Sequence, residues 1–180
     1  KNVEYKARKI NGEHRWFNMN ARVKQELSDG TLLIDGFTTD ITEEKRAREN
    51  ELRFKTALEV IQDGLWDWYV DTGEAYFSDT YYTMLGYEVG EFSPNFERFK
   101  ALVHPDDLPG TLEAIENTLK KGNSYICEFR MLSKNKKWRW IESRGKVVEY
   151  DMEGRPNRLI GTHSDITKRK ELEIKLRESE

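Results

Sequence analysis

The stretch GTHSDITKRK, residues 161–170, matches the stretch GFTTDITEEK at residues 36–45. Both segments carry Asp-Ile-Thr after a stretch that begins with glycine, and both continue into a charged run. Upstream of them, EFRMLSKNKKWRWI (128–141) aligns with EYKARKINGEHRWF (4–17), with one residue inserted near Arg155 in the second copy. Because several residue types recur in the same order, we infer an internal repeat, and this repeat determines how the rest of the chain is divided.

Each copy of the repeat predicts three strands followed by a charged helix. Tight turns are expected at Asn11-Gly12 and at Lys134-Asn135, since Asn-Gly strongly favours a β-hairpin. Further turns are expected at Asp29-Gly30 and at Glu153-Gly154. The sequence therefore predicts an antiparallel three-stranded meander in each copy, with strands at 5–10, 14–25 and 31–38 in the first and at 125–132, 138–150 and 157–164 in the second.

The segment between the two copies completes a fold around the second meander. It predicts two strands, two short helices and one longer helix, in the order 65–70, 75–78, 80–85, 95–103 and 108–121. Ser78 is expected to cap the first short helix, and Asp106 or Asp107 the longer one. The predicted fold class is α+β, with a five-stranded antiparallel sheet and helices on one face of it.

The unequal surroundings of the two copies predict the domain organisation. Residues 1–42 are interpreted as the C-terminal part of a truncated preceding domain, 43–61 as a linker helix, 62–167 as a complete domain and 168–180 as an exit helix. In the linker helix, Ala47, Phe54 and Ile61 recur every seven residues, with Asn50 and Ala57 between them. This short seam is typical both of coiled-coil pairing and of a solvated connector helix, and the sequence leaves both open.

Composition restricts the class of protein. The 180 residues carry a formal net charge of −3, which does not favour binding to nucleic acid or to an anionic membrane surface. Cys127 is the only cysteine, so the chain suits a reducing compartment, and no apolar run reaches the length of a membrane span. We expect a cytoplasmic segment without direct membrane contact, whose parent protein can be membrane-anchored elsewhere.

These sequence motifs and the order of the predicted elements resemble PAS domains with a C-terminal PAC motif. The matching residues of the second copy are Glu128, Phe129, Arg130, Arg139, Trp140, Gly161, Asp165, Ile166 and Thr167, and those of the first are Glu4, Tyr5, Lys6, Gly12, Arg15, Trp16, Gly36, Asp40, Ile41 and Thr42. GLWDWYVDTGEAYFSD (64–79) and VHPDD (103–107) are similar to the N-terminal half of such a domain. Lys136 departs from the pattern, because the family usually has glycine in this hairpin.

The resemblance implies a sensory and dimerisation module of a multi-domain signalling protein, such as a sensor histidine kinase or a diguanylate cyclase. The segment itself would not be an enzyme, and its partners would be a second copy and the adjacent PAS or output domains. By family analogy the signal-relay residues are Asp165, Ile166 and Thr167, with Asp40, Ile41 and Thr42 in the first copy. The same residues also fit a simple helix start, with an Asp or Thr cap and a buried Ile. A structural spacer in a PAS array is the other alternative.

The aromatic residues of the complete domain raise the possibility of a ligand pocket. They can form an ordinary core, or they can line a small cavity for a small-molecule ligand. The candidate lining residues are Trp66, Trp68, Phe77, Tyr81, Phe96, Phe99, Cys127, Phe129 and Trp140. No cofactor is expected, although a PAS domain that binds haem or flavin remains an alternative.

Other candidate sites favour structural interpretations. His104 precedes a predicted helix, so haem ligation by it is disfavoured, and His163 on the last strand is disfavoured further. The Asn-Cys-Arg motif of flavin photochemistry is absent around Cys127. The basic and aromatic segment at 134–140 fits a hairpin tip better than a nucleic-acid surface. We find no metal-ligand spacing and no catalytic constellation.

Overall fold

A computed structural model describes residues 2–178 of the chain, which form two compact units. One unit extends to Ala57 and the other begins at Leu58. The helix α1 (Thr42–Ile61) leads from the first unit into the second. Each unit is described by itself below.

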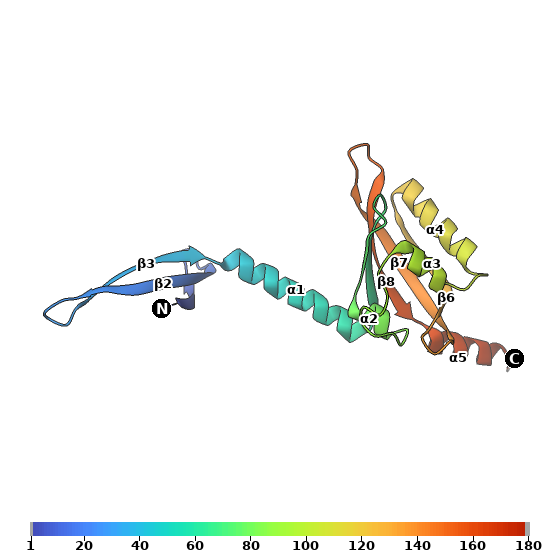
Figure 1. Cartoon of the computed structure of the whole chain (residues 1–180), viewed down its shortest axis with the longest axis horizontal. Coiled ribbons are helices and arrows are strands. Elements are labelled where there is room, and N and C mark those ends of the chain that lie inside the picture. Colours follow the sequence, from blue (N-terminus) through green and yellow to red (C-terminus); the bar gives the residue numbers. More distant parts are fainter. Residues whose placement is uncertain (1, 179–180) are drawn as a thin grey trace. The chain divides into compact units, whose positions relative to one another are not determined.

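The first unit is a three-stranded meander. The strands β1 (Asn2–Arg8), β2 (His14–Glu26) and β3 (Leu32–Asp40) pair as antiparallel neighbours in this order (Figure 1, blue). Gly12 and Gly30 take positive φ angles of 88° and 82° in the two turns, which glycine adopts without steric cost. Among the described residues, β3 pairs only with β2, so its other edge carries no neighbouring strand.

The second unit confirms the predicted α+β fold. Its elements are β4 (Gly64–Tyr69), β5 (Ala75–Phe77), α2 (Asp79–Thr83), α3 (Phe96–Leu102), α4 (Leu108–Lys121), β6 (Ser124–Leu132), β7 (Trp138–Tyr150), β8 (Pro156–Asp165) and α5 (Thr167–Glu178). The five strands form one antiparallel sheet in the order β5-β4-β8-β7-β6. The second meander therefore supplies the three strands β6, β7 and β8. The strand β4 pairs with the outer edge of β8, whereas the equivalent strand of the first unit, β3, has no strand at that edge among the described residues.

The core lies between this sheet and the helices α2, α3 and α4. Alternation along the strands turns Phe129, Met131, Ile141 and Leu159 inward, and their side chains are fully buried. Tyr81 of α2, Phe99 of α3 and Ile115 of α4 close the core from the helical side. Figure 1 shows α3 and α4 alongside the strands β6, β7 and β8.

Three local predictions have definite outcomes. Lys136 takes a left-handed backbone conformation with φ of 63°, as Gly12 does at the equivalent turn, so the hairpin keeps its shape despite the missing glycine. Ser78 precedes α2 as expected, but its hydroxyl accepts the Leu65 N–H (2.9 Å) and makes no cap bond. Asp107 occupies the N-cap position of α4 as expected, but its carboxylate makes no cap bond and binds Arg130 instead.

Candidate functional site

The Asp-Ile-Thr segment joins the last strand of the second unit to α5. The Thr167 N–H and hydroxyl both donate to Asp165 Oδ1 (2.9 and 2.5 Å), and the Thr167 hydroxyl oxygen accepts the Trp140 N–H (3.0 Å). The Ile166 N–H donates to the Trp140 carbonyl (2.9 Å), and the Ile166 side chain is buried. Arg139 donates to the second carboxylate oxygen of Asp165 (2.8 Å). The start of α5 is therefore hydrogen-bonded to both the backbone N–H and the backbone carbonyl of Trp140 on β7.

The first unit repeats this junction atom for atom. The Thr42 N–H and hydroxyl donate to Asp40 Oδ1 (3.0 and 2.6 Å), and the Thr42 hydroxyl oxygen accepts the Trp16 N–H (2.9 Å). The Ile41 N–H donates to the Trp16 carbonyl, and Arg15 donates to Asp40 (2.7 Å). We call this arrangement the Asp-Ile-Thr latch, made of Asp165, Ile166, Thr167, Trp140 and Arg139 in the second unit.

The latch keeps its aspartates charged. For Asp165, burial opposes the charge, but the hydrogen bonds from Thr167 and the cation of Arg139 outweigh it and hold the pKa below its usual value. The hydrogen bond from Thr42, followed by that from Arg15, lowers the pKa of Asp40 in the same direction. Both carboxylates are therefore acceptors at neutral pH, as the latch requires.

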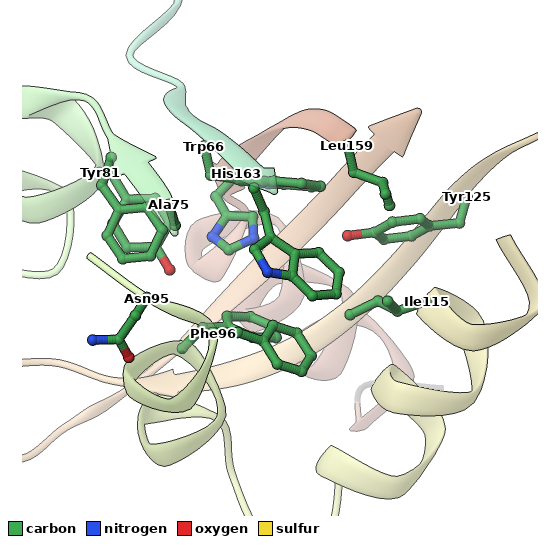
Figure 2. A pocket seen from close by; sticks show the side chains of 12 residues that line it. Trp66, Ala75, Tyr81, Asn95, Phe96, Ile115, Tyr125, Leu159 and His163 are labelled. Atoms are coloured by element: carbon green, nitrogen blue, oxygen red, sulfur yellow. The ribbon is translucent and has the colours of Figure 1, made fainter. Parts of the chain in front are cut away.

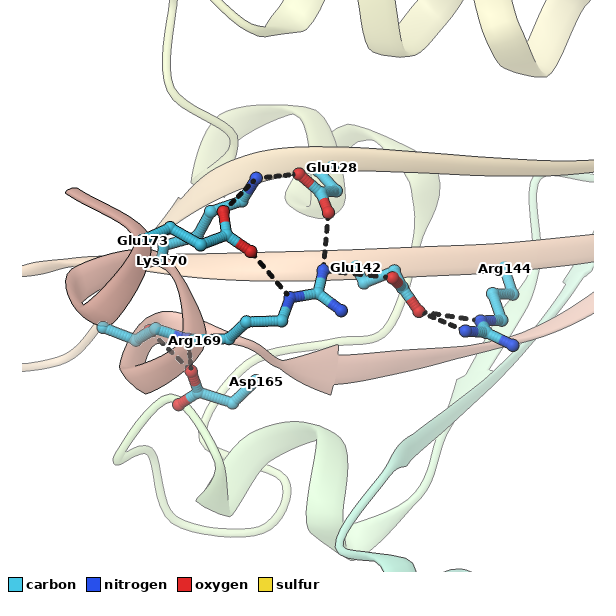
Figure 3. A network of polar contacts seen from close by, with 8 residues as sticks. Glu128, Glu142, Arg144, Asp165, Arg169, Lys170 and Glu173 are labelled. Atoms are coloured by element: carbon cyan, nitrogen blue, oxygen red, sulfur yellow. Dashed lines mark hydrogen bonds and ion pairs between the residues drawn. The ribbon is translucent and has the colours of Figure 1, made fainter. Parts of the chain in front are cut away.

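Two cations on the first turn of α5 extend the latch across the sheet (Figure 3). Arg169 contacts Glu128 (2.6 Å) on β6 and Glu142 (3.3 Å) on β7, and Lys170 pairs with Glu128. Arg144 contacts the other oxygen of Glu142 (2.6 Å). Hydrogen bonding to Arg144, and less strongly to Arg169, lowers the pKa of Glu142 although burial opposes this. The helix is thus tied to three strands within its first turn.

Trp140 does not line a core cavity as the sequence suggested. It stands opposite Arg130 in the β6–β7 register, whereas the neighbouring pair Phe129 and Ile141 points into the core. Alternation therefore places Trp140 on the sheet face opposite α2, α3 and α4. There its ring contacts two cations, the guanidinium of Arg130 at 5.4 Å and the ammonium of Lys170 at 5.3 Å.

The two copies differ in how many charges hold the exit helix. In the first unit Lys45 lies over the Trp16 ring (5.3 Å) and pairs with Glu4 (2.5 Å), as Lys170 does with Trp140 and Glu128. The sequence has Glu44 at the position equivalent to Arg169 and Asn18 at the position equivalent to Glu142. Only the second unit therefore carries the additional Arg169–Glu142 pair.

Arg130 also connects β6 to the start of α4. Its backbone N–H and its guanidinium donate to the Asp107 carboxylate at 2.9, 2.8 and 2.7 Å. This bidentate pair keeps the pKa of Asp107 below its usual value. Arg130 therefore contacts both Asp107, which precedes α4, and Trp140 of the latch.

We expect Asp107→Ala to lower the free energy of unfolding of the second unit by about 2 kcal/mol, because it leaves Arg130 and an edge-strand N–H without their acceptor. Denaturant unfolding followed by fluorescence measures the change. The control is Asp106→Ala, whose side chain is 78% exposed and lies 3.9 Å from Arg130. This neighbour should shift stability by no more than about 0.5 kcal/mol. Equal losses in both variants would contradict the assignment.

A small cavity lies between the sheet and the helices (Figure 2). Its volume is about 30 Å³, and its lining residues are Trp66, Trp68, Ala75, Phe77, Tyr81, Asn95, Phe96, Phe99, Ile115, Tyr125, Leu159 and His163. Six of the nine residues suggested by the sequence are among them. Phe129 is fully buried beside the cavity against Phe99 (ring centroids 5.7 Å), and Cys127 packs against the core.

The cavity lining contains polar atoms that have no partner among the described residues. They are the indole N–H groups of Trp66 and Trp68 and the hydroxyl of Tyr81, all of them buried. His163 is 3% exposed and stacks against Tyr81 with 5.0 Å between ring centroids. Burial lowers the pKa of His163 to about 3, so its ring is neutral at physiological pH. The cavity therefore presents neutral donors inside an aromatic wall.

The residues present do not fit a haem or a flavin. A volume of about 30 Å³ holds about two water molecules. His104 lies outside the cavity: its Nδ1 accepts the Asp106 N–H (3.2 Å), and its ring contacts Trp138 at 4.4 Å. Burial raises the pKa of Cys127 to about 11, which keeps this thiol protonated. Within residues 2–178 no group of three His, Cys, Asp or Glu side chains could hold a metal ion.

Similar proteins share this fold and belong to signalling systems. The PAS fold family matches residues 74–163, which is half of the chain. The sensor protein FixL of Bradyrhizobium diazoefficiens is 29% identical over 128 residues, 71% of this chain and 25% of that protein. The structure of a sensory box histidine kinase/response regulator from Burkholderia thailandensis has a TM-score of 0.62 at 35% identity, covering 71% of this chain and 94% of that one.

A third match has the same character. The structure of a domain of the putative light and redox sensing histidine kinase from Haloarcula marismortui has a TM-score of 0.52 at 25% identity, covering 64% of this chain and 98% of that one. The chain spans about a quarter of the length of FixL. Among the described helices none is long and apolar enough to cross a membrane. With its five-stranded sheet and the match over residues 74–163, the chain belongs to the PAS fold family.

Proposed function

We propose that this chain is a signal-relay module that passes the state of its second unit to α5 and from there to an adjacent output domain. The observation that carries the proposal is the latch together with the ion pairs of Arg169 and Lys170. These contacts attach the first turn of α5 directly to the strands of the sheet. A shift of β7 against β6 must then move α5. The relatives support this role, since several of them are sensor histidine kinases.

The proposal extends to the parent protein and to the first unit. The parent is a cytoplasmic or membrane-anchored sensor with a histidine kinase or diguanylate cyclase as its output, and the module works as a homodimer. Residues 1–42 are the C-terminal part of a preceding PAS domain with its own PAC motif. The free edge of β3 supports this interpretation, because the equivalent strand β8 pairs with β4 in the second unit.

We expect Asp165→Ala to loosen α5 while the core stays intact. Loss of a cap costs about 1 kcal/mol, so amides in the first turn of α5 should exchange with solvent about fivefold faster. Hydrogen exchange with mass spectrometry measures this. The matched control is Asp151→Ala, since Asp151 accepts similar bonds from Arg155 in the β7–β8 turn. An unchanged α5, or equal effects of both variants on α5, would contradict the relay.

Output is tested by joining the chain, at the end of α5, to the helix that enters a dimeric histidine kinase. Autophosphorylation should change severalfold with Asp165→Ala and remain unchanged with Asp151→Ala. If neither Asp165→Ala nor a core substitution such as Ile115→Ala alters output, the chain is a structural spacer.

The unpartnered polar atoms of the cavity favour a second function, the binding of a small neutral ligand that accepts hydrogen bonds. Trp66 and Trp68 supply N–H donors, and no charged side chain lines the cavity. A ligand of a few heavy atoms suits its volume. Mass spectrometry of molecules released on denaturation of freshly purified protein tests this: a small acceptor that is lost in Trp68→Phe supports binding, and water alone argues against it.

A further inference from the structure

A shallow groove lies on the outer face of the five-stranded sheet, opposite α2, α3 and α4. Its volume is about 350 Å³, and its lining residues are Ser124, Tyr125, Ile126, Arg144, Gly145, Lys146, Ile160, Gly161 and Thr162. They come from three neighbouring strands, β6, β7 and β8. This volume is within the range of small-molecule sites, about 300 to 1,000 Å³. The sheet separates the groove from the core cavity.

The register of the three strands arranges the side chains of the groove in two rows. The rows run across the strands and consist of Ser124, Lys146 and Ile160, and of Ile126, Arg144 and Thr162. They are two residues apart along each strand, roughly 7 Å. Between them, Gly145 and Gly161 turn toward the core, where a Cβ atom on either would meet the Trp66 ring. Backbone therefore forms the floor, and the two rows form the walls.

The middle strand of the groove contributes two cations. Lys146 is exposed and makes no ion pair within the described part of the chain. The Arg144 side chain is 60% exposed, and its Nε and Nη2 donate to Glu142 Oε1 (2.8 and 2.6 Å). The remaining Nη1 of Arg144 has no acceptor among residues 2–178. Both cations therefore retain hydrogen-bond donors for an anion in the groove.

The carboxylates beside the groove already have cationic partners. Asp67 of β4 accepts hydrogen bonds from Arg158 at 2.9 and 2.6 Å. Glu142 accepts hydrogen bonds from Arg144 and from Arg169. Lys146 is thus the cation whose charge is not balanced locally, which favours an anion close to it.

Apolar surface lies next to the two cations. Ile126 stands opposite Arg144 in the β6–β7 register, and its side chain is 65% exposed. Ile160 stands opposite Lys146 in the β7–β8 register and is partly exposed. An inorganic anion would leave this surface in contact with water, whereas an anion joined to a hydrocarbon chain would cover it.

We propose that the groove binds a small organic anion, a carboxylate joined to a short hydrocarbon chain. The carboxylate accepts hydrogen bonds from Lys146 and from Nη1 of Arg144, and the chain lies against Ile126. This site goes beyond the proposed function, and it differs from the core cavity, whose donors are neutral. Nucleic acid suits it less, because Glu128 and Glu142 on the same sheet face repel a polyanion.

Hexanoate is the probe, titrated into the isotope-labelled whole chain and followed by the nuclear magnetic resonance signals of the backbone amides. It should shift amides of residues 124–126, 144–146 and 160–162. Acetate lacks the chain and hexan-1-ol lacks the charge, so each should bind about fivefold more weakly. Equal binding of hexan-1-ol would show that the groove is no anion site. A stronger response to a glutamate-rich peptide would assign the groove to a protein partner, and either result would overturn the proposal.

Substitutions locate the two parts of the ligand. Lys146→Gln and Arg144→Gln should each weaken hexanoate binding about fivefold, and Ile126→Ser should weaken the binding of hexanoate but not of acetate. All three side chains are exposed, so the variants should fold, and their thermal unfolding checks this. The matched control is Lys137→Gln, which removes the same charge from an exposed residue just before β7. Equal losses in Lys146→Gln and Lys137→Gln would reduce the effect to general attraction by positive charge and refute the site.

The groove borders the network that holds α5 (Figure 3). Glu142 accepts from Arg144 at Oε1 and from Arg169 at Oε2. A carboxylate that draws Arg144 away leaves Glu142 to Arg169, so bound hexanoate should slow hydrogen exchange in the first turn of α5. This consequence rests on the proposed function. Unchanged exchange with hexanoate bound refutes the consequence and leaves the site, whereas absence of binding refutes the site and leaves the relay to the test on Asp165→Ala.

Discussion

Gly161→Ala should lower the free energy of unfolding of the second unit by about 3 kcal/mol or more, because a side chain at this position overpacks a rigid site. A Cβ atom on Gly161 would lie 2.1 Å from the Arg144 carbonyl oxygen and 2.2 Å from the Trp66 ring. The carbonyl belongs to β7, which pairs with β8 along its length, and the indole packs inside the core. Neither neighbour can move without breaking the sheet or the core.

Denaturant unfolding followed by tryptophan fluorescence measures this loss. The chain has five tryptophans, and all but Trp16 lie in the second unit, so the signal reports chiefly on that unit. The matched control is Gly110→Ala on α4, where a Cβ atom would meet no heavy atom within 4 Å. Alanine favours a helix over glycine, so this variant should gain up to about 1 kcal/mol. A loss of equal size in both variants would contradict the steric explanation.

Much of this fold could be predicted because the chain contains two copies of one motif, which can be aligned with each other. Two copies of one meander predicted the strand count and the turns, and Phe129 was expected in the core or in the lining of a cavity within it. The latch was predicted as a helix start for the same reason, since Asp40 and Asp165 recur in the same local sequence. Such features depend on residues close in sequence, where local propensity decides the outcome.

Features that depend on distant partners could not be predicted in this way. Asp107 was expected to cap α4, but Arg130, more than twenty residues away, competes successfully for its carboxylate. Trp140 was placed in the pocket because it is aromatic, whereas its face depends on the β6–β7 register. The role of Lys170 did leave a signal, because Lys45 and Glu4 recur as Lys170 and Glu128, and this recurrence points to the ion pair.

His163 is the residue whose setting was least visible in the sequence, and it carries the second large prediction. It is 3% exposed, and rings from several elements surround it. Its neighbours are Trp66, Tyr81, Phe99 and Phe129, with ring centroids 5.0 to 6.1 Å away. The titratable groups among its ring contacts and in the cavity lining are tyrosines, and burial alone lowers the pKa of His163 to about 3.

This pKa makes the second unit sensitive to mild acid. An unfolded histidine binds a proton below about pH 6.5, whereas the folded one stays neutral down to about pH 3. Unfolding therefore takes up a proton between these values, and stability falls as the pH falls through this window. The slope is about 1.4 kcal/mol per pH unit well inside the window, which gives a loss of about 2 kcal/mol between pH 7 and pH 5.

Unfolding of the second unit at pH 7 and pH 5 measures the loss, and His163→Phe should abolish it, because phenylalanine cannot take up the proton. The carboxylates with lowered pKa, such as Asp107 and Asp165, act in a more acidic window, because their unfolded forms bind protons only near pH 4. His14→Phe, in the first unit, should leave the slope unchanged. If the slope between pH 7 and pH 5 survives in His163→Phe, another group takes up the proton, and the neutral aromatic cage around His163 is not what makes the unit acid-sensitive.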